Sequence, residues 1–161
     1  MAASRSSRYS GSDSTSEFLM QVELSVLDTT IVMVFADMGP PDGPVIICIH
    51  GSPATYRAYH TMFQPLTEAG MRLVIPNFPG MGYTNVDDKE NFNFSPQHKA
   101  EVVKALIQKL KLERVEMIIG HSMGGHLAAL VAATDNNNII KSVCFLAGPG
   151  VTPHYYPFNS T

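Results

Sequence analysis

The chain has 161 residues, of which 45% are apolar and 16% charged, with a formal net charge of −3. This length is typical of one domain, and the balanced charge argues against nucleic acid or anionic lipid as a partner. The longest apolar run, residues 127–133, is far shorter than the roughly 18 residues that span a bilayer. Cys48 and Cys144 each lie inside an apolar run and are expected to be reduced core residues. We therefore expect a cytoplasmic domain without a transmembrane segment.

The N-terminal segment differs from the rest of the chain in composition. Seven of its first sixteen residues are Ser, and no apolar pattern repeats. Such a segment buries too little surface to offset its ordering entropy. We expect residues 1–17 to be a disordered tail and residues 18–161 to form the folded domain. Arg and Ser without early acidic residues also fit a mitochondrial transit peptide, so that compartment stays open.

Strand and helix patterns alternate along the remaining chain. Residues 21–27 alternate polar and apolar side chains, and residues 31–35 return as the second strand of a hairpin. Four continuous apolar stretches then follow, as in strands covered on both faces. Helical patterns separate them, with Pro65 expected to break or restart the first helix and Ser95–Pro96 expected to start the second. The four strands are expected at 45–49, 71–75, 115–119 and 142–146, and the helices from 55, at 96–112 and at 124–134. This order predicts an α/β fold with a mostly parallel sheet after an N-terminal antiparallel hairpin.

The motif Gly120-His121-Ser122-Met123-Gly124-Gly125 stands between a predicted strand and a predicted helix. A G-x-S-x-G turn in this context places Ser in a strained backbone geometry, and side chains at Gly120 or Gly124 would collide with neighbouring segments. The Ser122 hydroxyl would then be exposed at a helix N-terminus. There, the Met123 amide and the helix dipole can stabilise an oxyanion.

Two further loops follow strands and are expected at the same sheet edge. The first is His50-Gly51-Ser52-Pro53, in which Gly51 permits close backbone approach and the Ser52 amide is a candidate second oxyanion donor. We expect His50 to shape this loop by local hydrogen bonds rather than to act as a base. The second is the segment from Asn77 to Gly82, which indicates a fixed turn.

These three motifs, in this order, resemble the α/β-hydrolase fold superfamily, from about Val22 to Gly150. The resemblance implies Ser122 as the nucleophile, the Met123 and Ser52 amides as the oxyanion hole, and His50-Gly51 as the supporting loop. The Gly-His-Ser-Met-Gly-Gly form is common in its carboxylesterase and monoacylglycerol-lipase-like branches. One departure is Asn77, where the family usually has the Asp that supports the turn, so Asn77 puts the stability of this loop in question.

The acid and the base of a catalytic triad are not found in this chain. Partners follow the nucleophile in the order acid, then His, yet no Asp or Glu follows Asp135, which lies at the far end of the helix after Ser122. His154 is a candidate base, whereas His126 is expected to pack on its helix and Asp87-Asp88 to form a solvated turn. The family would continue with two more strands, so we expect a domain truncated before them. The last strand would then be an exposed apolar edge, open to strand pairing or self-association.

Three functions remain open at this point. The first is a serine hydrolase that cleaves an ester, thioester or related acyl bond of a small-molecule substrate through a Ser122 acyl-enzyme, in an incomplete or inactive form here. The second is a catalytically silent domain that binds a ligand or a partner. Other chemistry on this fold, such as acyl transfer or cofactor-free peroxidase activity, is a third possibility, whereas Ser122 disfavours the dehalogenase and epoxide-hydrolase branches, which use Asp. We expect neither a cofactor nor a metal.

Overall fold

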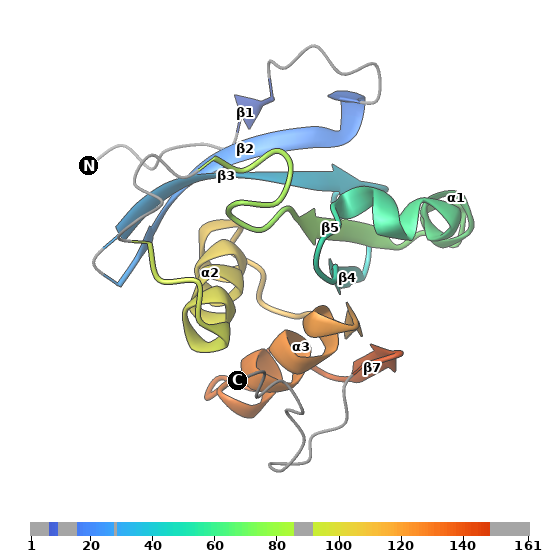
Figure 1. Cartoon of the computed structure of the whole chain (residues 1–161). Helices are drawn as coiled ribbons and strands as arrows, with labels where there is room; N and C mark the ends of the chain where they lie inside the picture. Colours follow the sequence, from blue (N-terminus) through green and yellow to red (C-terminus); the bar gives the residue numbers. More distant parts are fainter. Residues whose placement is uncertain (1–6, 10–15, 28, 86–91, 149–161) are drawn as a thin grey trace.

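One mixed β-sheet with helices on both faces forms the centre of the protein (Figure 1). The structure is a computed structural model that describes residues 7–9, 16–27, 29–85 and 92–148. The seven strands lie in the order β1-β2-β3-β5-β4-β6-β7. The strands are β1 (Ser7–Arg8), β2 (Leu19–Val26), β3 (Thr29–Met38), β4 (Val45–Ile49), β5 (Arg72–Pro76), β6 (Met117–His121) and β7 (Val143–Leu146); the helices are η1 (Ser16–Phe18), η2 (Tyr56–Tyr59), α1 (His60–Glu68), α2 (Pro96–Lys109) and α3 (Met123–Ala133).

The N-terminal hairpin and the parallel strands are confirmed. Strands β2 and β3 pair antiparallel, while β4 pairs parallel with both β5 and β6, and β6 with β7. Strand β3 extends beyond the predicted residues 31–35 because its C-terminal half pairs with β5, with Ala36 opposite Ile75. The local sequence pattern of either strand does not reveal this pairing, because the two strands are far apart in the chain.

Residues 7–9 depart from the disorder expected of the segment 1–17. Ser7 and Arg8 pair antiparallel with Gln21 and Met20 of β2. The Tyr9 amide donates to the Leu19 carbonyl at 3.0 Å, and its ring meets the Tyr83 ring edge-on at 6.1 Å. The expectation is therefore wrong for these residues, because the free edge of β2 and one aromatic contact outweigh their polar composition.

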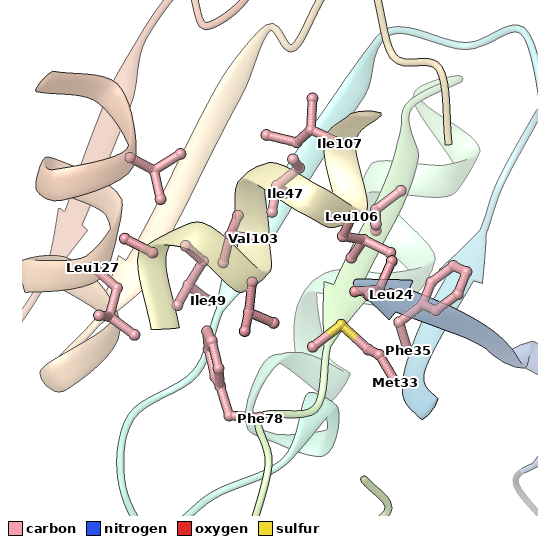
Figure 2. Packing of buried hydrophobic residues seen from close by; sticks show 14 of the residues in the cluster. Leu24, Met33, Phe35, Ile47, Ile49, Phe78, Val103, Leu106, Ile107 and Leu127 are labelled. Carbon is pink, nitrogen blue, oxygen red and sulfur yellow. The ribbon is translucent and has the colours of Figure 1, made fainter. Parts of the chain in front are cut away.

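Apolar side chains cover both faces of the sheet. Alternate residues of β4 enter different clusters, so that Ile47 and Ile49 lie with α2 and α3, whereas Ile46 and Cys48 lie on the face covered by α1. In Figure 2, Val103 and Leu106 of α2 lie over Ile47 and Ile49 of the sheet. The continuous apolar run of β4 thus follows from burial on both sides. Cys48 is buried and Cys144 half-buried, and both are free thiols.

Two helix predictions have different outcomes. Ser95 caps α2 as predicted, because its hydroxyl accepts from the His98 amide at 3.2 Å and Pro96 takes the first helical position. Pro65 does not break the first helix but lies inside α1. The helix tolerates it because Pro65 is on the exposed side, where the unpaired carbonyl can reach water.

Within the described residues, strand β7 forms one edge of the sheet, and β1 forms the other. Phe145 and Leu146 on β7 are 52% and 36% exposed. In this part of the chain, β7 is thus the exposed apolar edge that the sequence predicts.

Candidate active site

Ser122 stands at the turn between β6 and α3 in a left-handed backbone conformation. Its φ and ψ angles are 53° and −122°, a region that residues other than Gly rarely occupy. Ser122 is half-buried, and its side chain forms no capping hydrogen bond with the helix. The strained turn predicted for the G-x-S-x-G motif is present at this position.

Neighbouring backbone enforces the glycines of this turn. A Cβ atom added to Gly124 would lie 2.0 Å from the Ile49 carbonyl oxygen, and one added to Gly120 would lie 2.3 Å from the Gly124 oxygen. Real Cβ atoms do not approach this closely, and a backbone oxygen cannot move aside as a flexible side chain can. Both positions therefore exclude any side chain, as the sequence predicts.

Helix α3 presents its positive end at Ser122. Met123 is the first residue of the helix, so its amide has no acceptor within the helix. The Ser122 amide is fixed elsewhere, donating to the Leu146 carbonyl of β7 at 3.1 Å. A free amide and the helix dipole next to a hydroxyl provide favourable surroundings for a developing oxyanion.

The loop after β4 lies directly against Ser122. A Cβ atom on Gly51 would stand 3.0 Å from the Ser122 Cβ and 3.2 Å from Nδ1 of His121. Gly51 is thus needed for close approach, and it brings the next residue, the exposed Ser52, to the same edge of the sheet. The structure therefore brings together Ser122, Met123, Gly51 and Ser52 from two separate segments.

His50 shapes this loop and is not available as a base. It is fully buried, its Nε2 accepts a hydrogen bond from the Phe78 amide at 3.2 Å, and its Nδ1 lies 2.8 Å from the Gly51 carbonyl. Because a backbone amide can only donate, the proton lies on Nδ1, which donates to Gly51. Burial is the main cause that lowers the pKa of His50, opposed by the Gly51 hydrogen bond and reinforced by the charge of Lys99. His50 is therefore held neutral.

Asn77 strengthens the loop after β5 rather than weakening it. The side chain is fully buried; its Oδ1 accepts from the Tyr56 amide at 2.9 Å, and its Nδ2 donates to the Val34 carbonyl at 3.2 Å. An Asp carboxylate could accept the first bond but could not donate the second. The doubt that the sequence raised about this departure is wrong, because the amide satisfies partners of both kinds.

Two buried residues near the site were not identified from the sequence. The Tyr59 hydroxyl donates to the Ile49 carbonyl at 2.7 Å and thereby fixes the end of β4; burial raises its pKa. Lys99 on α2 is only 8% exposed. No local signal marks Tyr59, but Lys99 lies on the helical stripe of Val102, Val103 and Leu106, where a charged side chain is unexpected.

Within the described ranges, the Ser122 side chain forms no hydrogen bond with a histidine or a carboxylate. Asp135 lies beyond the far end of α3, where its carboxylate accepts from the Ile140 amide at 2.8 Å, and His126 is half-buried within α3. His154 and the pair Asp87-Asp88 lie outside the described residues. Within the described ranges, no helix is long and apolar enough to cross a membrane, and no three His, Cys, Asp or Glu residues gather as a metal site would require.

Comparison with known proteins assigns the class. Residues 44–158 match the α/β hydrolase fold family, and the chain belongs to this family. The chain is 33% identical over 100 residues to a haloalkane dehalogenase of Mycolicibacterium paratuberculosis (strain ATCC BAA-968 / K-10), which covers 60% of the chain and 33% of that protein. It is 31% identical over 115 residues to a serine hydrolase-like protein of Danio rerio, covering 71% of the chain and 34% of that protein.

A solved structure agrees with this assignment. A membrane phospholipase A, described as a bacterial virulence factor, superimposes with a TM-score of 0.71 and 25% identity over 86% of this chain and 43% of its own length. The chain spans between about a third and two fifths of the length of the first curated relatives it matches. The fold class and the family are thus shown, and hydrolases are among the relatives.

Proposed function

We propose that this protein is a serine hydrolase that cleaves an ester, thioester or similar acyl bond of a small-molecule substrate through an acyl-enzyme on Ser122. One observation carries the proposal: Ser122 has φ 53° at the start of α3, against the backbone of Gly51. Such strain persists where the surrounding structure enforces it, and it is characteristic of functional positions. A domain that only binds a ligand has no evident need for it.

In the proposed reaction, the Ser122 oxygen attacks the acyl carbon, and the carbonyl oxygen of the substrate becomes an oxyanion. The Met123 amide at the N-terminus of α3 and the Ser52 amide donate to it. The oxyanion then collapses, the bond to the leaving group breaks, and that group departs with the proton that the Ser122 hydroxyl loses, exchanged through solvent. Water later hydrolyses the acyl-enzyme, which releases the carboxylic acid and restores the Ser122 hydroxyl. His50 holds the donor loop through Gly51 and Phe78 and takes no proton from Ser122.

The test is covalent labelling of the protein with a fluorophosphonate probe. We expect phosphonylation at Ser122, none in Ser122→Ala, and unchanged labelling in Ser25→Ala, which alters an exposed serine of β2. Labelling that persists in Ser122→Ala would contradict the assignment, as would a protein that does not label.

A second candidate is a catalytically silent domain of the same fold that binds an acyl ligand. It is favoured by the surroundings of Ser122, where the described residues place no His–carboxylate pair. Turnover of a nitrophenyl ester separates the two candidates. A rate in Ser122→Ala well below that of the parent protein supports the hydrolase, and equal rates support the silent domain.

A further inference from the structure

Lys99 is a buried cation in an otherwise apolar helix face. It lies on α2 with 8% of its surface exposed, alongside the fully buried Val102, Val103 and Leu106. Removing an ammonium group from water is costly unless an opposite charge compensates it. A lysine on this stripe is therefore expected to reduce stability, and its presence calls for another reason.

The amine of Lys99 points at the residue that follows Ser122. Its Nζ lies 3.7 Å from the Met123 sulfur, across the interface in which α2 packs beside α3 (Figure 1). A thioether is only a weak acceptor and carries no charge. The positive charge is therefore solvated poorly, and it lies against the side chain of Met123, the first residue of α3.

The charge of Lys99 reaches the opposite wall of the site. It contributes to lowering the pKa of His50 in the loop after β4, and burial lowers the pKa of Lys99 itself. No carboxylate among the described residues offsets that effect, since Glu101 on the same helix pairs with Lys104 at 2.8 Å. His98, the other titratable neighbour on α2, is also buried, and its Nε2 has no hydrogen-bond partner.

We propose that Lys99 is a positioning residue of the oxyanion site, whose ammonium charge stabilises the negative charge that develops next to Ser122 without touching the substrate. The inference rests on the proposed function. It explains why a cation occupies the α2 stripe: a charge in a poorly solvated site acts over a longer range than it would in water. The Met123 side chain separates the amine from the substrate.

The experiment measures the rate constant of Ser122 phosphonylation from pH 6 to 10 in the full protein. Lys99→Met removes the charge and keeps the length of the side chain, Lys99→Arg keeps the charge at every pH, and Lys104→Met is the control on the same helix. At pH 7 we expect labelling about tenfold slower in Lys99→Met and within about threefold of the parent in Lys99→Arg and Lys104→Met. The parent rate should fall at alkaline pH as Lys99 loses its proton, and Lys99→Arg should lack this fall.

Unfolding in urea gives an independent readout. Because Lys99→Met replaces a buried charge with an apolar group, we expect it to unfold at a higher urea concentration than the parent while it labels more slowly. A structural role would lower both properties together. Loss of both stability and labelling in Lys99→Met and Lys99→Arg would overturn the inference.

The remaining outcomes separate this inference from the proposed function. A parent protein that labels at Ser122, with Lys99→Met labelling at the same rate, contradicts the role of Lys99 and leaves the hydrolase assignment intact. A parent protein that does not label at Ser122 contradicts both.

Discussion

The Nε2 atom of His50 accepts a hydrogen bond from the Phe78 amide at 3.2 Å, and this bond joins the loop after β4 to the loop after β5. The bond requires a neutral imidazole, because a protonated ring has no lone pair to accept with. The conformation of the candidate oxyanion loop therefore depends on the protonation state of one buried histidine.

This dependence predicts how stability changes with pH. The pKa of His50 is lowered by burial, so below about pH 6.5 the unfolded chain binds a proton that the folded protein does not. Neutral His50 therefore stabilises the folded protein fully at a pH above the pKa that this histidine has in the unfolded chain. This stabilisation is lost progressively as the pH falls below that pKa. Between pH 8 and pH 5, urea unfolding should show a smaller loss in the free energy of unfolding for His50→Gln than for the parent. The exposed His60 gives the control: His60→Gln should behave as the parent, and an equal loss in all three proteins would contradict the prediction.

A substitution at Gly124 should be severe although it adds one methyl group. The Cβ of Gly124→Ala would lie 2.0 Å from the Ile49 oxygen, so the backbone of α3 or β4 must move, which we expect to cost about 3 kcal/mol or more. Gly148→Ala is the control, because its nearest neighbours would be 3.8 Å away. Thermal unfolding should separate the two variants by several degrees. Equal unfolding temperatures would mean that the close approach of α3 to β4 is not required.

The strain at Ser122 can be measured by comparing two replacements. With φ at 53°, Ser122→Gly relieves the left-handed strain and Ser122→Ala retains it, so we expect the glycine variant to be about 1 kcal/mol more stable. At the exposed Ser25 in β2, the order should reverse, because glycine weakens a strand. Urea unfolding of the four variants tests this, and a Ser122→Gly variant no more stable than Ser122→Ala would show that Ser122 is not strained.

Asn77 donates a hydrogen bond that Asp, the residue more common in the family at this position, could not donate. Replacing Asn77 with Asp should therefore destabilise the protein. Asn77→Asp loses the bond to the Val34 carbonyl and buries a carboxylate next to that oxygen, which should cost about 2 kcal/mol or more at pH 7. Burial should raise the pKa of the new carboxyl, so the variant should regain stability as the pH falls toward 4.

The matched control for this variant is Asn136→Asp on the surface, where urea unfolding should change little. An Asn77→Asp protein as stable as the parent at pH 7 would show that the Val34 bond contributes nothing.

The sequence predicts those features that local chemistry determines. The run at 45–49 coincides with β4, and Ser95 and Pro96 start α2, because an apolar run and a capping pair act within a few residues. Pairing over long distances cannot be predicted in this way. The extension of β3 along β5, the addition of residues 7–9 to β2 and the second bond of Asn77 each depend on a partner that is distant in sequence.

In the candidate site, too, the residues of a local motif could be predicted from the sequence, whereas features that depend on distant partners could not. Ser122 and its glycines form a contiguous motif, so the sequence suffices to identify them, and the structure shows the turn that they require. The neutral state of His50 follows from its burial and from the hydrogen bond of the Phe78 amide, 28 residues away. Lys99 differs, since its place on an apolar helical stripe was visible in the sequence and marks a position that the pattern alone would have assigned to a hydrophobic residue.

The amide of Ser122 donates to the carbonyl of Leu146, so the candidate nucleophile is tethered to the outermost described strand. Any force that shifts β7 along or away from the sheet would rotate the serine turn with it. If the proposed reaction takes place at Ser122, a molecule that binds to β7 is expected to change the rate of acylation without contacting the serine.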